Sequence, residues 1–386
     1  MKLAFVLFKY FPYSGLARDC LRIANECIKR GHQVKLYAMT WQGDQPEHIE
    51  VEILTTKAFS NHIKIKKYHQ RLLKKLQQNP VDLLVGFNRM PNLDLYYAAD
   101  PCFKQKSQQN HAFLYQYTPR YRLYSRFEAA VFDPSVNVEL LFIAKNQIPI
   151  FTKYYDTPPL RFHLLPPGIA LDRKRPPNAE QKRLEYRQQL GIKKHHQVLL
   201  MVGSVYHGKG VDRTLQAIAS LPHDIKQNIK LMVAGLDDNT PYLKLAAQLK
   251  IESHILFMEP RQDIAHLLLA ADLFLHPARH ENTGTVLLEA IVAGLPQIIS
   301  AACGYAFHIE KAQAGQVLAE PFLQQTYNQT LLNVLTDSEA LALYQQKALE
   351  YAKTEDLYQL PEKAVDIIEG TAKQRKKPNY IQQKAV

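Results

Sequence analysis

The chain has 386 residues, of which 46% are apolar and 22% charged, and this composition excludes a protein that is disordered throughout. The 48 basic residues exceed the 36 acidic ones, and residues 1–170 hold 23 of the basic but only 13 of the acidic residues. Four cysteines without a Cys-x-x-Cys pair argue against zinc and disulfide frameworks and favour a reducing cytosol, and no apolar run reaches the roughly 18 residues that span a membrane.

Strand-length apolar runs alternate with helix-length amphipathic runs along the first part of the chain, which is typical of a parallel α/β domain. We expect helices near residues 17–30 and 63–78. The expected strands are 3–8, 33–38, 51–54, 82–87 and 138–143.

The pattern breaks at residues 164–168, where two prolines and a glycine predict a domain boundary. A second α/β series follows, with expected strands at 198–202, 229–234, 255–257, 273–276 and 297–300. We therefore predict two Rossmann-like, doubly wound domains (1–167 and 168–360) that face a central cleft, where strand ends commonly bind ligands. Residues 361–386 should form a helix that returns to the first domain, followed by a basic tail.

Two glutamates, Glu281 and Glu289, have seven residues between them at the start of the helix that Gly284 and Thr285 open. They flank a helix N-terminus, whose free N–H groups favour an anion. A ligand could place phosphate on the amides and hydroxyls on the carboxylates. The alternative is that both acids only complement the helix dipole.

Three weaker signals accompany this pair. The loop at 203–210 contains glycines that allow close approach of a phosphate, and Lys209 supplies a positive charge. Gly15 follows the first expected strand, and Asp100 ends an apolar run before a proline, where it could be only a turn residue. The sequence has no Walker A, no Gly-x-Gly-x-x-Gly and no clustered metal ligands.

Basic residues gather where acids are absent, in residues 58–81 and again in residues 101–127. In the second stretch they alternate with aromatic rings. An anionic membrane or glycolipid, a nucleic acid and an ordinary solvated helix face all remain open as explanations. The residues that we predict to face a membrane or acceptor are Lys104, Lys106, Arg120, Tyr121, Arg122, Tyr124 and Arg126.

Together these segments resemble the retaining glycosyltransferases of family 4, and among them the lipopolysaccharide core glucosyltransferases of Gram-negative bacteria. The resemblance spans nearly the whole chain and implies the GT-B fold. It is carried by residues 9–12 with Gly15, 31–32, 61–62, 86–88, 98–100, 166–169, 172–174, 209–213, 271–273, 281–289, 293–296 and 303–305.

The resemblance implies a UDP-glucose donor held mainly by the second domain, with no metal and no other cofactor. Glu281 would bind hydroxyls of the donor sugar and Glu289 those of the ribose. Lys209 and Arg173 would neutralise the diphosphate with the amides of Thr283, Gly284 and Thr285, and Arg261 is a further candidate donor residue. Gly15 would let the first-domain loop close over the diphosphate, while Asp19 and Asp100 would face the sugar or the acceptor. Glu281, Lys209 and Asp100 are thus the candidate catalytic residues.

The expected reaction is retaining transfer of glucose to an inner-core heptose of lipopolysaccharide, at the cytoplasmic face of the inner membrane. Its expected partners are the UDP-sugar, the glycolipid acceptor and anionic lipids, with no nucleic acid. Transfer of galactose or N-acetylglucosamine is the alternative within the class, and a non-catalytic lipid or nucleic-acid binder is the alternative outside it. This chain departs from the family in one respect, because the relatives usually carry arginine where it has Gly208. We expect the loss of this bidentate phosphate contact to weaken stabilisation of the leaving group, unless His207, Arg213 or Arg261 substitutes for the arginine.

Overall fold

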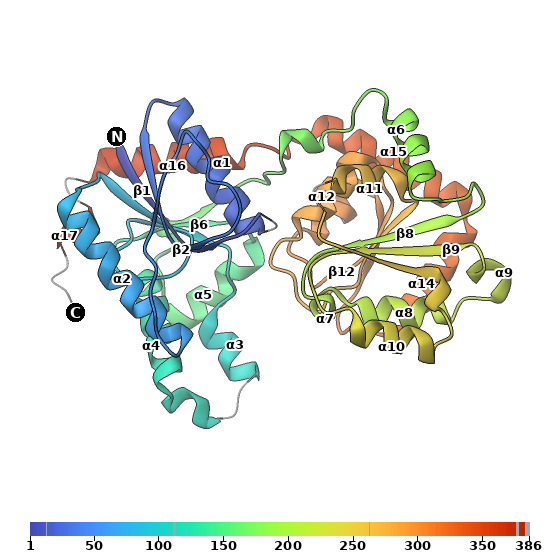
Figure 1. The fold of residues 1–386 in the computed structure, drawn as a ribbon, viewed down its shortest axis with the longest axis horizontal. Helices are drawn as coiled ribbons and strands as arrows, with labels where there is room; N and C mark the ends of the chain where they lie inside the picture. Colours follow the sequence, from blue (N-terminus) through green and yellow to red (C-terminus); the bar gives the residue numbers. More distant parts are fainter. Residues whose placement is uncertain (13, 111–112, 262, 376–377, 383–386) are drawn as a thin grey trace. The chain divides into compact units, whose positions relative to one another are not determined.

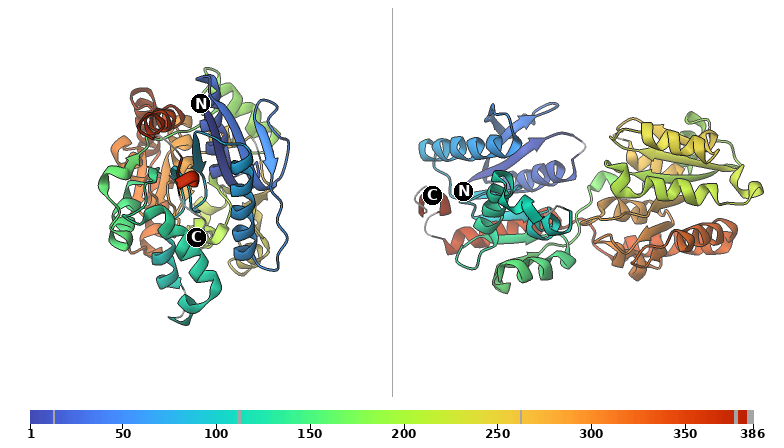
Figure 2. Two further views of the ribbon diagram at one scale, coloured as in Figure 1. Left: turned by 90° about the vertical axis from the view of Figure 1, so that its left-hand side faces the viewer. Right: turned by 90° about the horizontal axis from the view of Figure 1, so that it is seen from below.

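The computed structural model describes the chain except residues 13, 111–112, 262, 376–377 and 383–386. The chain forms two compact units: unit 1 comprises Met1–Pro167 and Gln359–Val386, and unit 2 comprises Gly168–Tyr358. Each unit has one parallel sheet with helices on both faces (Figure 1 and Figure 2). The predicted class of two doubly wound α/β domains is confirmed.

Unit 1 is built on seven parallel strands in the order β3-β2-β1-β4-β5-β6-β7, so the crossovers change direction between β1 and β4. Its strands are β1 (Lys2–Tyr10), β2 (Gln33–Trp41), β3 (Glu50–Ile53), β4 (Leu83–Gly86), β5 (Leu95–Ala98), β6 (Glu139–Phe142) and β7 (Phe162–Leu164). Its helices are α1 (Gly15–Lys29), α2 (Asn61–Gln78), α3 (Phe103–Asn110), α4 (Pro119–Phe132), α5 (Ile148–Tyr155), α16 (Leu360–Gln374) and α17 (Asn379–Gln382). A hydrophobic core lies on each face of this sheet, and alternate residues of β1 point into one or the other. Phe5 packs with α1 and α16 on one face, whereas Val6 packs with α2, α4 and α5 on the other.

Unit 2 has six parallel strands in the order β10-β9-β8-β11-β12-β13, with the change of direction between β8 and β11. Its strands are β8 (Gln197–Val202), β9 (Ile229–Ala234), β10 (Ile255–Met258), β11 (Leu273–His276), β12 (Gln297–Ser300) and β13 (Gly315–Leu318). Its helices are α6 (Ala179–Gln189), α7 (Tyr206–Lys209), α8 (Val211–Ala219), α9 (His223–Lys226), α10 (Thr240–Gln248), α11 (Ile264–Ala270), α12 (Thr285–Ala293), α13 (Ala306–Ala312), α14 (Gln324–Thr336) and α15 (Ser338–Thr354). Ligands of such sheets bind where neighbouring crossovers diverge, beyond the carboxyl ends of the strands.

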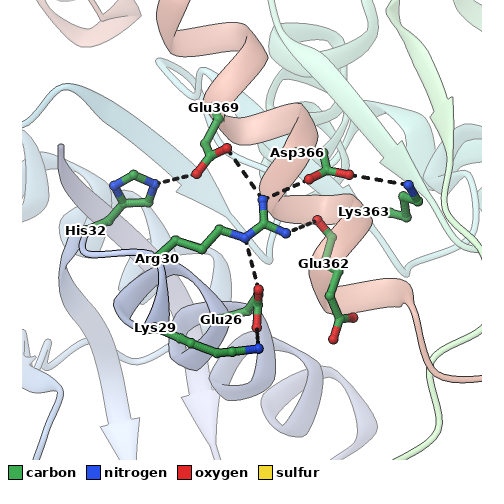
Figure 3. A network of polar contacts seen from close by, with 8 residues as sticks. All are labelled: Glu26, Lys29, Arg30, His32, Glu362, Lys363, Asp366 and Glu369. Carbon is green, nitrogen blue, oxygen red and sulfur yellow. Dashed lines mark hydrogen bonds and ion pairs between the residues drawn. The ribbon is translucent and has the colours of Figure 1, made fainter.

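Helix α16 lies beside α1 in unit 1, and a single arginine joins the two helices (Figure 3). Arg30, at the end of α1, donates from Nε to Glu26 (2.9 Å), from Nη1 to Asp366 (2.8 Å) and from Nη2 to the Glu362 carbonyl oxygen (3.1 Å). Its hydrogen bond lowers the pKa of Asp366. The guanidinium therefore ties α1 to a helix that lies more than 300 residues away in the sequence.

The segment after α16 packs against the unit 1 sheet at the amino-terminal ends of β4, β5 and β6. The Asn379 backbone N–H donates to the buried carboxylate of Asp94 (2.8 Å), and its side-chain amide donates to the Asn137 carbonyl oxygen (2.6 Å). The Tyr380 hydroxyl accepts from the Val81 N–H (2.8 Å). Of the predicted basic tail, residues 376–377 and 383–386 lie outside the described residues.

None of the helices that the structure describes combines the length and the apolar character needed to cross a membrane.

Candidate active site

The loops that follow β8 and β11 meet at the point where the unit 2 crossovers diverge. Their close approach depends on Gly210, which has φ 75° and ends the short helix α7. A Cβ atom at this position would lie 2.2 Å from the carbonyl oxygen of Pro277. Only glycine satisfies both the backbone conformation and the contact, so this residue brings the two loops together.

Lys209 and Glu281 form an ion pair between these two loops. Both side chains are largely shielded, with exposed fractions of 21% and 17%. Burial lowers the pKa of Lys209, because the charged ammonium loses hydration. Glu281 places a carboxylate against this shielded ammonium. The structure thus brings together two of the three predicted catalytic residues.

His276, the last residue of β11, lies under this pair and is fully buried. Its Nε2 atom is 3.5 Å from Glu281 Oε2, the same oxygen that pairs with Lys209. Burial, and secondarily the Lys209 charge, lower the pKa of His276 to about 3. The ring is therefore neutral at physiological pH. His276 was not among the residues predicted from the sequence.

Helix α12 begins beside the ion pair. Gly284 has φ 86° and precedes the first helical residue, Thr285, and no side-chain cap hydrogen bond is formed there among the described residues. Thr283 is buried, and its carbonyl oxygen accepts from the Tyr305 N–H (2.8 Å). The amides of this helix end are thus held in place, where they can receive an anion.

Glu289 lies inside α12 and is almost entirely buried. Its Oε1 atom is 3.9 Å from Nε of Arg173, which belongs to the 3-10 helix Leu171–Arg173. The segment that carries Arg173 packs against α12. The structure therefore pairs a second predicted donor carboxylate with a second predicted cation.

Arg279 organises the Lys209 loop, although it was not among the residues predicted from the sequence. Its guanidinium binds both carboxylate oxygens of Asp212 (2.8 and 2.6 Å) and donates to the carbonyl oxygen of His207 (2.7 Å). Its backbone N–H donates to the carbonyl oxygen of Gly208 (2.9 Å). This bidentate contact raises the pKa of Arg279 and fixes the backbone on both sides of Lys209.

Two arginines considered as substitutes for the arginine missing at Gly208 have contacts of their own. Arg213 donates to the Pro277 carbonyl oxygen (3.0 Å), and its guanidinium lies 3.7 Å from the Phe322 ring centre. Arg261, predicted to bind the donor, donates to Asp263 (2.7 and 2.6 Å) and to the Tyr186 hydroxyl (2.9 Å). A donor role for Arg261 stays a prediction.

The predicted residues of unit 1 lie near the carboxyl ends of β1 and β5. Gly15 is the first residue of α1, and Asp19 accepts from the buried hydroxyl of Tyr97 (2.7 Å). Burial raises the pKa of Asp19 against the opposing effect of this hydrogen bond. Asp100 follows β5, is 44% exposed and lies 3.9 Å from Arg89. The roles of Gly15, Asp19 and Asp100 stay predictions.

The predicted membrane-facing residues lie on or next to α3 and α4, and they divide into two groups. Lys104, Tyr121 and Tyr124 are half-buried, with the two tyrosines packed on Phe103 and the Lys104 ammonium over the Tyr155 ring. The second group, Lys106, Arg120, Arg122 and Arg126, is exposed. We call these four residues, together with the exposed Leu114 (73%) and Tyr117 (56%), which were not among the predicted ones, the basic–aromatic surface.

A buried carboxylate fixes these helices to each other. Glu128 of α4 accepts from the backbone N–H groups of Phe103 (2.7 Å) and Lys104 (3.1 Å) at the start of α3. It also accepts from the Tyr155 hydroxyl (2.6 Å) and pairs with Arg89. Since Arg89 also lies near Asp100, one network connects the helices to a predicted site residue.

In the described part of the chain, no three His, Cys, Asp or Glu side chains gather as metal ligands would. The candidate site offers cations and amides that donate hydrogen bonds and carboxylates that accept them, a combination that suits an anionic and hydroxyl-rich ligand.

The model of the family "Glycosyl transferases group 1" matches residues 182–353. The lipopolysaccharide glucosyltransferase WaaG of Escherichia coli (strain K12) is 45% identical over 370 residues, which cover 96% of this chain and 99% of that protein. A D-inositol 3-phosphate glycosyltransferase of Corynebacterium glutamicum is 27% identical and covers about half of each chain.

Solved structures agree with these sequence relatives. The crystal structure of WaaG, a glycosyltransferase involved in lipopolysaccharide biosynthesis, matches with a TM-score of 0.91 over 95% of this chain and 100% of that chain. The structure of Anabaena Alr3699/HepE in complex with UDP-glucose matches with a TM-score of 0.72 at 18% identity, over 96% and 100% of the two chains, which shows a common fold.

Proposed function

The chain belongs to the group 1 glycosyltransferases, and on that premise we propose that it transfers glucose from UDP-glucose to a heptose in the inner core of lipopolysaccharide, with retention of the anomeric configuration. The family expected from the sequence is confirmed. The observation that carries the proposal is the Lys209–Glu281 pair beside the N-terminus of α12, in a chain 45% identical to WaaG.

We assign the groups of the donor site from the charged side chains of unit 2. Lys209 and Arg173 bind the diphosphate together with the amides of residues 283–285. Glu281, freed from Lys209, accepts hydrogen bonds from hydroxyls of the glucose, and Glu289 accepts from those of the ribose. The buried contacts of both carboxylates support these roles, because a shielded carboxylate that binds hydroxyls loses little to competing water.

Glucose transfer requires stabilisation of the negative charge that develops on the departing UDP. The bond from the anomeric carbon to the phosphate oxygen breaks, and the acceptor hydroxyl forms its new bond on the same face. The departing phosphate accepts the hydroxyl proton. Lys209 and the α12 amides stabilise the charge that develops on this phosphate, so that no metal ion is needed.

The acceptor is an anionic glycolipid, and we propose that unit 1 meets it at the cytoplasmic face of the inner membrane. Unit 1 has 29 basic and 16 acidic residues, whereas unit 2 has 19 and 20. The whole positive excess therefore lies on unit 1. The basic–aromatic surface combines exposed arginines with exposed Leu114 and Tyr117, a combination that suits anionic headgroups.

Purified protein with a heptose-terminated lipopolysaccharide acceptor tests the proposal. The donors are UDP-glucose, UDP-galactose and UDP-N-acetylglucosamine, and the product is measured by mass spectrometry. We expect transfer from UDP-glucose alone at a substantial rate. Transfer from another donor in its place would refute the glucosyl assignment, and transfer from none would refute the enzymatic proposal.

A further inference from the structure

His276 has an environment that its place in the core does not explain. Its side chain is completely buried, yet neither ring nitrogen has a hydrogen-bond partner within the part of the chain that the structure describes. A buried polar group without a partner costs free energy, so such a residue needs a reason beyond packing. A leucine would fill a similar volume at lower cost.

The strand and a neighbouring ring fix the direction of this imidazole. His276 lies in β11, and its backbone pairs with Ile299 of β12. Its ring lies nearly parallel to that of Phe274, with an interplanar angle of 14° and ring centres 5.8 Å apart. Held in this way, the ring directs Nε2 toward Glu281, whose Oε2 atom is 3.5 Å away.

One carboxylate oxygen of Glu281 thus faces two groups, the ammonium of Lys209 and the imidazole of His276. If Lys209 turns to the diphosphate of a donor, Glu281 loses its counter-charge in a shielded site. A shielded carboxylate without a hydrogen-bond donor beside it would cost free energy and would lose its fixed orientation. A small rotation of Glu281 brings Oε2 within hydrogen-bond distance of Nε2–H.

We propose that His276 is a positioning residue that acts through Glu281: its Nε2–H group holds the carboxylate toward the donor sugar while Lys209 binds the diphosphate. This inference rests on the proposed function. It assigns His276 a part in binding the sugar and none in binding the nucleotide. The imidazole neither gains nor loses a proton in this role.

Titration calorimetry with UDP and with UDP-glucose on the full-length protein separates an effect on sugar binding from an effect on nucleotide binding. We expect His276→Asn to bind UDP within about twofold of wild type but to bind UDP-glucose about tenfold more weakly, with a similar fall in kcat. His276→Gln should recover most of both losses, because its amide reaches the position of Nε2, whereas the asparagine amide stops one bond short.

A double-variant cycle tests whether the effect passes through Glu281. In a Glu281→Gln background, His276→Asn should cause no further loss of UDP-glucose binding. An equal loss for UDP and UDP-glucose, or a full loss that persists in the Glu281→Gln background, would overturn the inference. Wild-type protein that binds no UDP would instead refute the proposed function, and the inference with it.

Nuclear magnetic resonance of ¹⁵N-histidine wild-type protein gives a test that needs no variant. We expect the His276 proton on Nε2, with a chemical shift that changes on addition of UDP-glucose and much less on addition of UDP. A proton on Nδ1 in the UDP-glucose complex would overturn the inference even if the substituted proteins do not fold.

Discussion

Lys209 and Glu281 form an ion pair that joins the loop after β8 to the loop after β11, the two strands between which the unit 2 crossovers diverge. In this pair a cation and a carboxylate, both largely shielded from solvent, neutralise each other. A nucleotide-sugar offers each partner a new contact, phosphate for the amine and hydroxyls for the acid. Breaking this pair is therefore a step in donor binding under the proposed function.

Substitution of each partner should separate nucleotide binding from sugar transfer. Lys209→Met should weaken UDP binding about tenfold or more, because it removes a charge-assisted contact to phosphate. Glu281→Gln should leave UDP binding unchanged or tighter, since Lys209 is released, while glucose transfer falls at least about 100-fold. Calorimetry and a transfer assay measure the two quantities. Weaker UDP binding in Glu281→Gln would contradict the assigned roles.

Gly208→Arg should be tolerated and should improve donor binding. A Cβ atom at Gly208 has only an ordinary contact, 3.6 Å from Val205, and its backbone does not require glycine. The added guanidinium can bind phosphate oxygens bidentately, so we expect the UDP Kd to fall about tenfold. Gly210→Ala is the steric control and should destabilise the fold, since its Cβ would meet the Pro277 carbonyl oxygen. Unchanged UDP affinity in Gly208→Arg would show that this loop does not face the diphosphate.

The network in Figure 3 predicts that Arg30 stabilises the packing of α16 on α1. Arg30→Met should lower the free energy of unfolding by about 1–3 kcal/mol, since it removes several hydrogen bonds to partly shielded carboxylates. Lys29→Met is the matched control: Lys29 also contacts Glu26, but its side chain is 74% exposed, so the loss should stay below about 0.5 kcal/mol. Urea unfolding measures both, and equal effects would contradict a special role for Arg30.

The buried imidazole of His276 predicts a dependence of stability on pH. Its pKa is lowered to about 3 in the folded protein, chiefly by burial, so below the ordinary value of about 6.5 the unfolded chain binds a proton that the folded chain does not. The part of the free energy of unfolding that depends on the neutral ring is therefore fully present above pH ~6.5. It is lost as the pH falls toward 3, by up to about 1.4 kcal/mol per pH unit. Urea unfolding of His276→Gln between pH 7 and 5 should show a shallower slope than wild type. Identical slopes would contradict a buried neutral ring.

Neutralising Arg120, Arg122 and Arg126 together to glutamine should weaken binding to anionic liposomes on the order of 100-fold at low salt. All three side chains are exposed, so the fold should not change. The matched control replaces three exposed lysines of unit 2, Lys193, Lys194 and Lys244, and should bind like wild type. Co-sedimentation measures the partition. Equal binding of both triple variants would contradict a membrane role for the basic–aromatic surface.

The sequence predicted the fold where apolar runs are long or bounded by clear turns. The strands β9, β11 and β12 begin and end at the expected residues, and the helix α12 begins at Thr285 as expected. Three strands were missed, β5, β7 and β13, and each has only three or four residues. The edge strand β13 starts at Gly315 and leaves Gln316 exposed, so its composition carries little signal of burial.

Residue patterns alone predicted the site where neighbours in sequence are neighbours in space, whereas the pairing of Lys209 with Glu281 and of Arg173 with Glu289 was expected only through the family resemblance. Glu281, Gly284 and Thr285 lie within one short segment, and their relation to a helix start can be read directly. Arg279 acts through Asp212 and His207, which lie 67 and 72 residues earlier, and no local pattern connects them. His276 gave a possible signal, a histidine at the end of an otherwise apolar strand, but its direction toward Glu281 depends on tertiary packing.

Retaining glucosyl transfer is the central claim, and the structure of the product tests it most directly. The protein is incubated with a heptose-terminated acceptor and UDP-glucose that is ¹³C-labelled in the sugar, and the anomeric signal of the product is recorded by nuclear magnetic resonance. We predict a new α-glucosidic linkage on the heptose, because the donor glucose is α-linked and its configuration is retained. A β-linked product, or no labelled product under conditions where UDP binds, would contradict the account.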